Sequence, residues 1–438
     1  MKNYTLNTIL FLCDSFFLWI VYYSVGWFRE IAEMIGMLPF RTYDQRDFIF
    51  VYVLITLILL YEKIYKYRFD FWEETKLILK ALLLSFVIVL SFLMLSKINM
   101  EYSRSFLVMY FVALFLLMPI FKRYTKKMLF SSLYLRKRVK IIGDKEQKKV
   151  MKEEFKKNWY LGLHSVESTH DAIFIATKDM PMDTLNTYLN KYMKESKDLY
   201  LLPYISKVNF AEANMMEYFN IRTSVIHIEN ELLKPRNILL KELFEKIITL
   251  IIFPFFLLLH IFISYLIKID SKGYVLFKQR RLGKNNNFFK CLKYRTMLEN
   301  SDELLSSYLR SHPDEVAYHE KYHKYKNDPR ITKIGKFLRR TSLDELPQII
   351  NVLKGDMNLV GPRPYMLEEM TKIEDDLHTI LSVKPGITGL WQVSGRNNVT
   401  FESRKELDIW YIQNWSLWMD LVILFKTIKV VLMRKGAQ

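Results

Sequence analysis

Four apolar stretches in the first third of the sequence restrict the fold more than any other feature. They cover approximately residues 5–26, 48–62, 78–96 and 106–122. Each is close to the roughly 20 residues that a helix needs to cross the hydrocarbon core of a bilayer. The first contains Asp14 and lacks a small-residue cleavage site, so we expect it to persist as a span. The sequence therefore predicts a membrane protein that begins with a four-helix transmembrane bundle at residues 1–125.

The distribution of basic residues predicts which ends of this bundle are cytosolic. Lys and Arg are more frequent in the loop 63–76 than in the loop 97–104, and a basic run at 122–140 follows the fourth stretch. By the positive-inside rule, both ends of the bundle then lie in the cytosol. The cysteines, Cys13 in an apolar run and Cys291 in a basic strand-like segment, support neither a disulfide framework nor a thiolate metal site.

A fifth apolar segment, residues 247–267, is long enough to span a membrane but carries signals against crossing. Basic residues stand on both sides of it: Lys241, Lys246, Lys268, Lys272, Lys278, Arg280 and Arg281. Crossing would carry the second group outside, against the charge rule. Pro254, in the middle, removes a backbone hydrogen bond and bends a helix. We expect a re-entrant membrane helix at about 243–268, with a fifth true span as the alternative.

The region between the bundle and this segment, residues 126–235, has a different character. Short apolar runs at 138–145, 172–177 and 199–205 alternate with polar, helix-like segments, which predicts a small Rossmann-like α/β domain. The first run ends at Gly143 without the G-x-G-x-x-G pattern of dinucleotide-binding proteins. We therefore expect a degenerate domain that serves regulation or dimerisation.

The pattern H-E-x-x-H at residues 319–323 matches the helix signature of zinc proteases. Its surroundings are charged on all sides, give no apolar face that could bury a metal, and offer no third ligand at a suitable spacing. We expect a solvated helix here, without zinc.

The C-terminal region combines positive charge with short, rigid motifs. The net charge of +18 favours anionic partners such as phosphates, acidic lipids or nucleic acid. An arginine recurs in each motif bounded by Gly or Pro: Arg281, Arg295, Arg330, Arg339, Arg363 and Arg396. Because guanidinium groups bind phosphate oxygens in a bidentate manner, the set indicates a diphosphate substrate, although any single one could be an ordinary surface charge. No recognised nucleic-acid-binding motif accompanies them, so we expect no nucleic acid partner.

Two adjacent acids, Asp344 and Glu345, lie among these arginines. Pro347 lacks a backbone N–H and fits the first turn of a helix, so we expect that helix to run from Asp344 to Lys354, with Gly355 as its stop. At this positive end of the helix dipole, both carboxylates are expected to be ionised. Their side chains point about 100° apart, so one could attack phosphorus while the other holds Mg²⁺. The simpler alternative is that the acids only favour the start of a helix.

The motifs D-E-L-P-Q (344–348), K-G-D-M (354–357) and G-P-R-P (361–364) carry a resemblance. From about residue 241 onward the chain resembles the catalytic domain of the polyprenyl-phosphate glycosyl-1-phosphate transferases, and the whole chain is similar to the large form of that family. The resemblance implies a monotopic, mostly α-helical catalytic domain at residues 236–438, anchored by a re-entrant helix bent at a proline. It also implies a place in the bacterial inner (cytoplasmic) membrane, multi-pass, with this domain on the cytoplasmic face.

The resemblance further assigns roles to residues. Asp344 matches the family's nucleophile, and Glu345 matches the acid associated with Mg²⁺, so both are candidate metal ligands. Candidates for binding the substrate phosphates are Gln279, Arg281, Lys293, Arg295, Arg339, Arg340 and Arg363. Candidates for contacting the nucleotide or sugar are Asp328, Arg330, Gln348, Trp391, Gln392 and Arg396. The chain departs from the family at Glu245, where an aspartate is usual, and at Phe253, where a serine usually precedes the proline.

The function that the resemblance implies is transfer of a hexose-1-phosphate, with galactose favoured, from a UDP-sugar to undecaprenyl phosphate. UMP is released through a covalent phosphosugar-aspartate intermediate, and the product begins O-antigen, capsule or exopolysaccharide assembly. A homodimer is expected. Two alternatives stay open: a membrane glycosyltransferase that moves only the sugar, and a non-enzymatic basic membrane scaffold. The aromatic segment 408–425 suits either a membrane-interface surface or a packed core helix.

Overall fold

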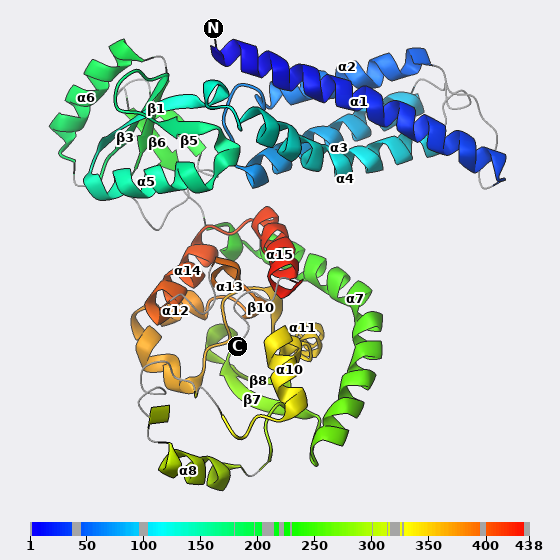
Figure 1. The fold of residues 1–438 in the computed structure, drawn as a ribbon, viewed down its shortest axis with the longest axis vertical. Coiled ribbons are helices and arrows are strands. Elements are labelled where there is room, and N and C mark those ends of the chain that lie inside the picture. The colour runs from blue at the N-terminus through cyan, green and yellow to red at the C-terminus, as the bar shows by residue number, and fades with distance from the viewer. Residues whose placement is uncertain are drawn as a thin grey trace. The chain divides into compact units, whose positions relative to one another are not determined.

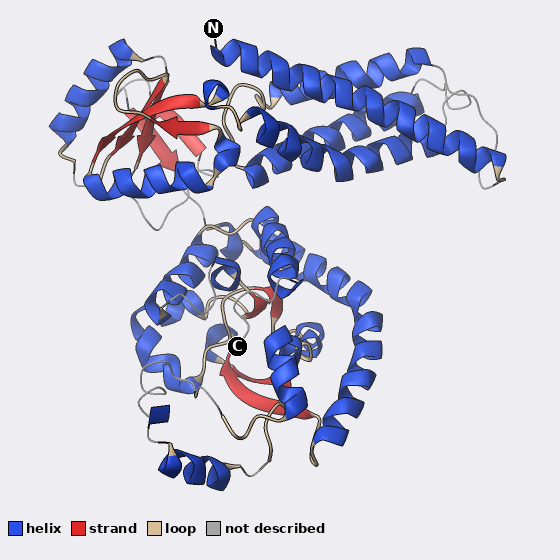
Figure 2. Cartoon of the chain, in the orientation of Figure 1, coloured by secondary structure: helices blue, strands red, loops and turns tan. Residues whose placement is uncertain are grey.

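The computed structural model is mostly helical and divides into two compact units, Met1–Ile205 and Ser206–Gln438. It describes residues 2–36, 45–95, 104–178, 180–196, 198–203, 214–218, 223–227, 230–299, 301–312, 314–315, 325, 328–394 and 400–432. Figure 1 labels the elements, and Figure 2 shows how helices predominate over strands in both units.

The first unit opens with the helices that the apolar stretches predict. They are α1 (Lys2–Met34), α2 (Gln45–Tyr61), α3 (Phe71–Leu95) and α4 (Arg104–Leu129). Among the described residues, α1, α3 and α4 are long and apolar enough to cross a membrane, whereas the apolar part of α2, Phe48–Tyr61, is shorter. The prediction of four helices is thus confirmed, but the apolar part of α2 is shorter than the roughly 20 residues that span a bilayer core.

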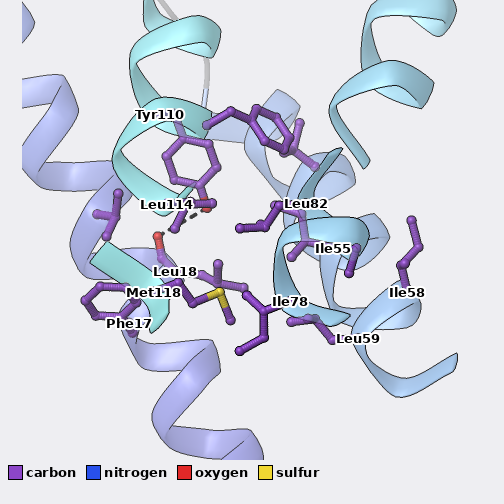
Figure 3. Packing of buried hydrophobic residues seen from close by; sticks show 14 of the residues in the cluster. Phe17, Leu18, Ile55, Ile58, Leu59, Ile78, Leu82, Tyr110, Leu114 and Met118 are labelled. Carbon is purple, nitrogen blue, oxygen red and sulfur yellow. Dashed lines mark hydrogen bonds between the residues drawn. The ribbon is translucent and has the colours of Figure 1, made fainter. Parts of the chain in front are cut away.

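Apolar side chains from all four helices form the core of this bundle. In Figure 3, Leu18 of α1, Ile55 of α2, Leu82 of α3 and Leu114 of α4 point toward one another. The hydroxyl of Tyr110 donates to the backbone carbonyl of Leu18 at 3.4 Å, so the phenol is satisfied inside the core. This packing joins α1 to α4 and α2 to α3.

Buried ion pairs between helices explain how charged residues fit inside the bundle. Lys122 of α4 bonds to Asp14 of α1, and Lys126 of α4 bonds to Glu74 of α3. All four side chains are almost completely buried. A charge in an apolar environment is costly unless it is paired, so each carboxylate accompanies an ammonium group.

A small parallel sheet follows the bundle. Its order is β2-β1-β3-β4, from β1 (Lys137–Gly143), β2 (Leu163–Ser165), β3 (Ala172–Ala176) and β4 (Leu199–Leu202). Helices α5 (Lys145–Lys157) and α6 (Met182–Glu195) flank it, as Figure 2 shows. The three apolar runs correspond to β1, β3 and β4, while the three-residue β2 was not predicted. The α/β character is as expected, and the likeness to a Rossmann fold stays a prediction.

The second unit begins with a hairpin of β5 (Asn214–Tyr218) and β6 (Thr223–His227), followed by α7 (Pro235–Asp270). This unit also contains two further strand pairs. The antiparallel pair is β7 (Leu276–Leu282) with β8 (Phe288–Tyr294), and the parallel pair is β9 (Asn358–Val360) with β10 (Gly386–Thr388). The helices after α7 are α8 (Asp302–Ser311), α10 (Lys333–Thr341), α11 (Gln348–Lys354), α12 (Leu377–Ile380), α13 (Leu390–Ser394), α14 (Phe401–Gln413) and α15 (Leu417–Leu432).

Helix α7 contains the fifth apolar segment. It runs without interruption for 36 residues, with Pro254 inside it, and is long and apolar enough to cross a membrane. Figure 1 shows it as a curved helix along one side of this unit. One face is buried against the unit, at Asn237, Lys241, Glu245, Thr249, Phe256, Ile263 and Ile267. Large apolar side chains on the other face, such as Leu258 and Phe262, are exposed.

A buried ionic cluster fixes the first part of α7. Lys241 Nζ lies 2.7 Å from Glu245 Oε1 and 2.6 Å from Asp420 Oδ2 of α15. The Glu245 carboxylate also accepts the backbone N–H groups of Leu359 at 3.0 Å and Val360 at 3.2 Å, in β9. The glutamate that departs from the family pattern therefore ties α7 to β9, while Lys241 ties α7 to α15.

The aromatic segment 408–425 packs into this unit. Tyr411, Trp415 and Ile423 are buried in one apolar cluster with Val352 and Val360. The Trp415 indole donates to Asp420 Oδ2 at 2.8 Å. The packed-core alternative therefore holds for these side chains, whereas Phe425 is exposed.

Candidate functional site

A large pocket lies within the second unit. Its volume is about 1510 Å³, and residues of α7, β7, β8, α10 and the turn after α10 line it. Most of the predicted site residues are among them: Gln279, Arg281, Lys293, Arg295, Arg330, Arg339, Asp344, Glu345, Gln348, Arg363, Trp391 and Gln392. The structure thus brings together side chains that are separated by up to 113 residues in the sequence, from Gln279 to Gln392.

The β7–β8 hairpin supplies the first wall. Phe277 pairs with Lys293, Gln279 with Cys291, and Arg281 with Phe289. Because side chains alternate between the faces of a sheet, and paired residues share a face, Gln279, Arg281 and Lys293 extend from the same face. This hairpin face therefore presents two cationic groups and an amide to the pocket.

The acid pair lies in a turn of 3₁₀-helix, η7 (Leu343–Glu345), between α10 and α11. Ser342 ends α10 in the left-handed region, with φ of +56°, and redirects the chain into this turn. The prediction that an α-helix begins at Asp344 was wrong, because α11 begins at Gln348, after Pro347. Around Pro347 the backbone bonds are of the i+3 type, from Leu346 N–H to Leu343 and from Ile349 N–H to Leu346. The stop at Gly355, with φ of +85°, is confirmed.

Burial dominates the electrostatics of Asp344. Desolvation and, to a lesser extent, the neighbouring charge of Glu345 raise the pKa of its carboxyl to about 6, although Lys293 and Arg339 oppose the shift. The expectation of a fully ionised Asp344 at the helix end neglected this desolvation, which the sequence does not show. Lys293 Nζ lies 2.7 Å from Glu345 Oε1, so the second acid is directly paired with a cation. At neutral pH Asp344 is still mostly ionised and can act as a nucleophile.

The arginines that line the pocket include Arg281, Arg339 and Arg363. Arg281 donates to the Pro364 carbonyl at 3.1 Å and to Gln279 Oε1 at 2.7 Å, and its buried Nε has no partner among the described residues. Burial and the nearby Arg363 lower the pKa of Arg281. Arg339 donates from Nε to Thr296 Oγ1 at 2.9 Å. These clustered cations would be stabilised by an anionic ligand such as a diphosphate.

Other predicted cations are engaged with the protein or lie elsewhere. Arg295 donates to the Ser271 carbonyl at 2.7 Å and to Glu299 at 3.3 Å. Arg330 forms two bonds with Asp328, at 2.9 and 2.7 Å, so Asp328 orients an arginine and does not itself line the pocket. Arg340 is exposed on α10 and is absent from the lining. Arg396 lies outside the described residues, as does the H-E-x-x-H pattern.

Trp391 forms an aromatic part of the pocket wall. The guanidinium groups of Arg363 and Arg404 lie 5.8 and 4.5 Å from its ring centre. Asp408 accepts the Tyr365 hydroxyl at 2.9 Å and the Arg363 backbone N–H at 3.3 Å, which positions the loop that carries Arg363. Sequence reasoning did not single out Arg404 or Asp408, because neither stands in a short motif.

Sequence reasoning also missed the contribution of α7 to the pocket. His260, Ser264 and Lys268 of this helix line it. Their spacing of four residues, which places them on one side of a helix, could have found them. The apolar residues around them obscured that signal.

The acid pair is also a candidate site for Mg²⁺. No group of three or more His, Cys, Asp or Glu side chains that could hold a metal occurs among the described residues. Mg²⁺ is often held by one or two carboxylates together with substrate phosphates and water. Asp344 and Glu345 are two adjacent carboxylates that line the pocket, so they fit that smaller requirement.

The sequence of this chain is similar to those of known sugar transferases. Residues 236–434 match the family described as bacterial sugar transferase. The undecaprenyl-phosphate galactose phosphotransferase of Salmonella typhimurium is 33% identical over 402 residues, which is 85% of this chain and 84% of that protein. The chain belongs to the bacterial sugar transferase family.

Two other relatives carry related names. The UDP-galactose-lipid carrier transferase of Erwinia amylovora is 34% identical over 403 residues, covering 85% of this chain and 84% of that protein. The UDP-glucose:undecaprenyl-phosphate glucose-1-phosphate transferase of Klebsiella pneumoniae is 31% identical over 281 residues, covering 62% and 56%. The protein is therefore an enzyme, a sugar transferase, and the pocket that holds the acid pair lies within its family domain.

Proposed function

We propose that this sugar transferase moves a hexose-1-phosphate from a UDP-sugar to undecaprenyl phosphate, releasing UMP and starting the assembly of a polysaccharide. The observation that carries the proposal is the position of Asp344, a carboxylate in a pocket where Lys293, Arg281 and Arg363 supply positive charge. Relatives with 33% and 34% identity bear galactose in their names, and one with 31% identity bears glucose. Galactose is the sugar that we favour.

The chemistry follows from the charges in the pocket. Asp344 Oδ attacks the β-phosphorus of the donor, forming an O–P bond while the bond to the leaving UMP oxygen breaks. Arg281, Arg339 and Arg363 neutralise the charge that develops on the phosphates. An oxygen of the lipid phosphate then attacks the same phosphorus and displaces the Asp344 carboxylate. Mg²⁺, held by Glu345 and Asp344, would supply further charge neutralisation on the diphosphate.

The position of α7 supports a membrane-bound site for this reaction. Its first part is tied to β9 by Glu245, and its last part packs through Ile263 and Ile267 on Tyr294 and Leu338. A helix that crossed a bilayer would have the hydrocarbon core between its two ends. Packing of both ends on one body supports a re-entrant path. The distribution of basic residues supports a place for this unit on the cytoplasmic face of the inner membrane.

The test is product analysis with a panel of UDP-sugars. Full-length protein in lipid vesicles with undecaprenyl phosphate is given UDP-galactose, UDP-glucose or UDP-N-acetylglucosamine. We expect UMP and a lipid-linked diphosphate sugar, with UDP-galactose as the best donor. Release of UDP would establish the sugar-only transferase, and the absence of either nucleotide would favour the scaffold. The expected homodimer is tested separately by the mass of the protein in detergent.

A further inference from the structure

A polar stripe interrupts the apolar surface of α7 where this helix lines the pocket. The stripe consists of His260, Ser264 and Lys268. At 1.5 Å per residue it extends about 12 Å along the helix axis. Its neighbours on one side, Ile263 and Ile267, are buried against the protein. Those on the other side, Ile261, Tyr265 and Ile269, are exposed.

The stripe therefore marks the boundary between the protein-packed face and the exposed apolar face of α7. Polar groups in a membrane segment are costly and usually face a polar cavity or a ligand. Here the cavity is the pocket that also holds Asp344 and Glu345. A ligand that reaches this stripe along the apolar face of α7 would place its polar group in the same pocket as the acid pair.

The contacts of each residue leave it able to bind an anion. His260 Nδ1 lies 2.9 Å from the Tyr294 hydroxyl, and the two rings stack at 5.6 Å, which fixes the imidazole. When the hydroxyl donates to Nδ1, Nε2 carries a proton that can be donated to a phosphate oxygen. Ser264 Oγ is buried without a hydrogen-bond partner in the described part of the chain. Lys268 is exposed, and among the described residues it has no carboxylate partner.

We propose that His260, Ser264 and Lys268 form the subsite for the phosphate of the lipid acceptor. This inference rests on the proposed function, because it assumes that a lipid phosphate is a substrate. A phosphate monoester has several acceptor oxygens, which suits a hydroxyl, an imidazole N–H and an ammonium group along one helix side. The apolar chain would then lie on the exposed side of α7, next to Ile261 and Tyr265. Arg281 of the hairpin and Arg363 of the G-P-R-P loop then remain available to bind the phosphates of the donor.

Binding of radiolabelled undecaprenyl phosphate to full-length protein in lipid nanodiscs tests the subsite without requiring turnover. Lys268→Gln and Ser264→Ala should each weaken binding, by about tenfold for the lysine, because a charge-assisted hydrogen bond is lost. Lys246→Gln is the matched control, since Lys246 is an exposed lysine of α7 that does not line the pocket. It should bind as the wild type does. All variants should keep the wild-type unfolding temperature.

Nanodiscs of two lipid compositions distinguish binding at a specific subsite from general attraction of lysines to acidic headgroups. One contains phosphatidylcholine alone, and the other also contains phosphatidylglycerol. The proposal predicts the same loss for Lys268→Gln in both. Equal losses for Lys268→Gln and Lys246→Gln, found only with phosphatidylglycerol, would overturn it. Absence of binding to the wild type, or binding unchanged in both pocket variants, would also overturn it. Failure of the proposed function appears separately, as the absence of UMP in the donor panel.

Discussion

Lys293 Nζ of β8 lies 2.7 Å from Glu345 Oε1, in the turn that also carries Asp344. The hairpin is thereby joined to the acid pair through one ion pair inside the pocket. Lys293 also acts on the neighbouring acid, because its charge lowers the pKa of Asp344 while burial and Glu345 raise it. The reactivity of Asp344 therefore depends on the hairpin as well as on its own turn.

The first prediction concerns pH. The pKa of Asp344 is raised to about 6, and only its ionised form is a nucleophile. The kcat/KM for the donor should therefore rise with pH through about 6 and level off above it. Lys293→Gln removes a charge that lowers this pKa, so the rise should move to higher pH. A pH profile between about 5 and 8 measures both. An identical midpoint in the two proteins would contradict the account.

The second prediction concerns the nucleophile. Asp344→Asn should reduce sugar-phosphate transfer by at least about 10³-fold, as expected when a covalent nucleophile is lost. The fold should survive, because the raised pKa means that ionising this carboxyl costs more free energy in the folded protein than in the unfolded chain. This cost is fully present above pH about 6, and the asparagine variant avoids it. The unfolding temperature at neutral pH should thus be unchanged or higher. Transfer by Asp344→Asn at the wild-type rate would show that Asp344 is not the nucleophile.

The third prediction concerns the metal. Removal of divalent cations with a chelator should abolish transfer, and Mg²⁺ should restore it, because the two carboxylates and the diphosphate are all anionic and repel one another without a cation. Glu345→Gln should raise the Mg²⁺ concentration needed for half-maximal activity. Full activity in excess chelator would show that the arginines and Lys293 are sufficient.

The fourth prediction concerns the anchor of α7. Lys241→Met leaves Glu245 and Asp420 buried without their ammonium partner, which should destabilise the protein by about 3–5 kcal/mol. Lys246→Gln changes an exposed lysine of the same helix and should stay within about 0.5 kcal/mol. Denaturant unfolding in detergent compares the two. Equal stability would mean that the cluster does not hold α7 in place.

The fifth prediction concerns the bend before the acids. Ser342 has φ of +56°, a conformation that glycine adopts freely and β-branched residues avoid. Ser342→Val should cost about 1–3 kcal/mol and lower kcat by shifting the acid pair, whereas Ser342→Gly should be tolerated. Thermal unfolding and kcat measured on both variants check this. A valine variant with wild-type stability would contradict the role of the bend.

Particular residues show what the sequence could and could not predict. The motifs located Asp344, Glu345 and Lys293, and helix signals located Gly355 as a stop. The start of α11 was misplaced because the positive φ of Ser342 is a property of the folded backbone. Arg339 and Arg340 stand together in the sequence, yet only Arg339 lines the pocket. Adjacent helical residues point about 100° apart, and the sequence alone does not say which one faces the site.

Burial and long-range contacts were the other missing information. The pKa of Asp344 depends on side chains that cover it from elements distant in sequence. The polar stripe of α7 was present in the sequence, but its meaning depends on the pocket beside it. The buried pairs of Asp14 with Lys122 and Glu74 with Lys126 likewise join residues of different helices.

The most direct test of the central claim is trapping of the covalent intermediate. Full-length protein is mixed with UDP-galactose labelled in the β-phosphate, without lipid acceptor, and the digested protein is analysed by mass spectrometry. The account predicts label on the peptide that contains Asp344, one UMP released for each labelled protein, and loss of the label when undecaprenyl phosphate is added. Formation of lipid-linked product at a normal rate with no labelled Asp344 would contradict it.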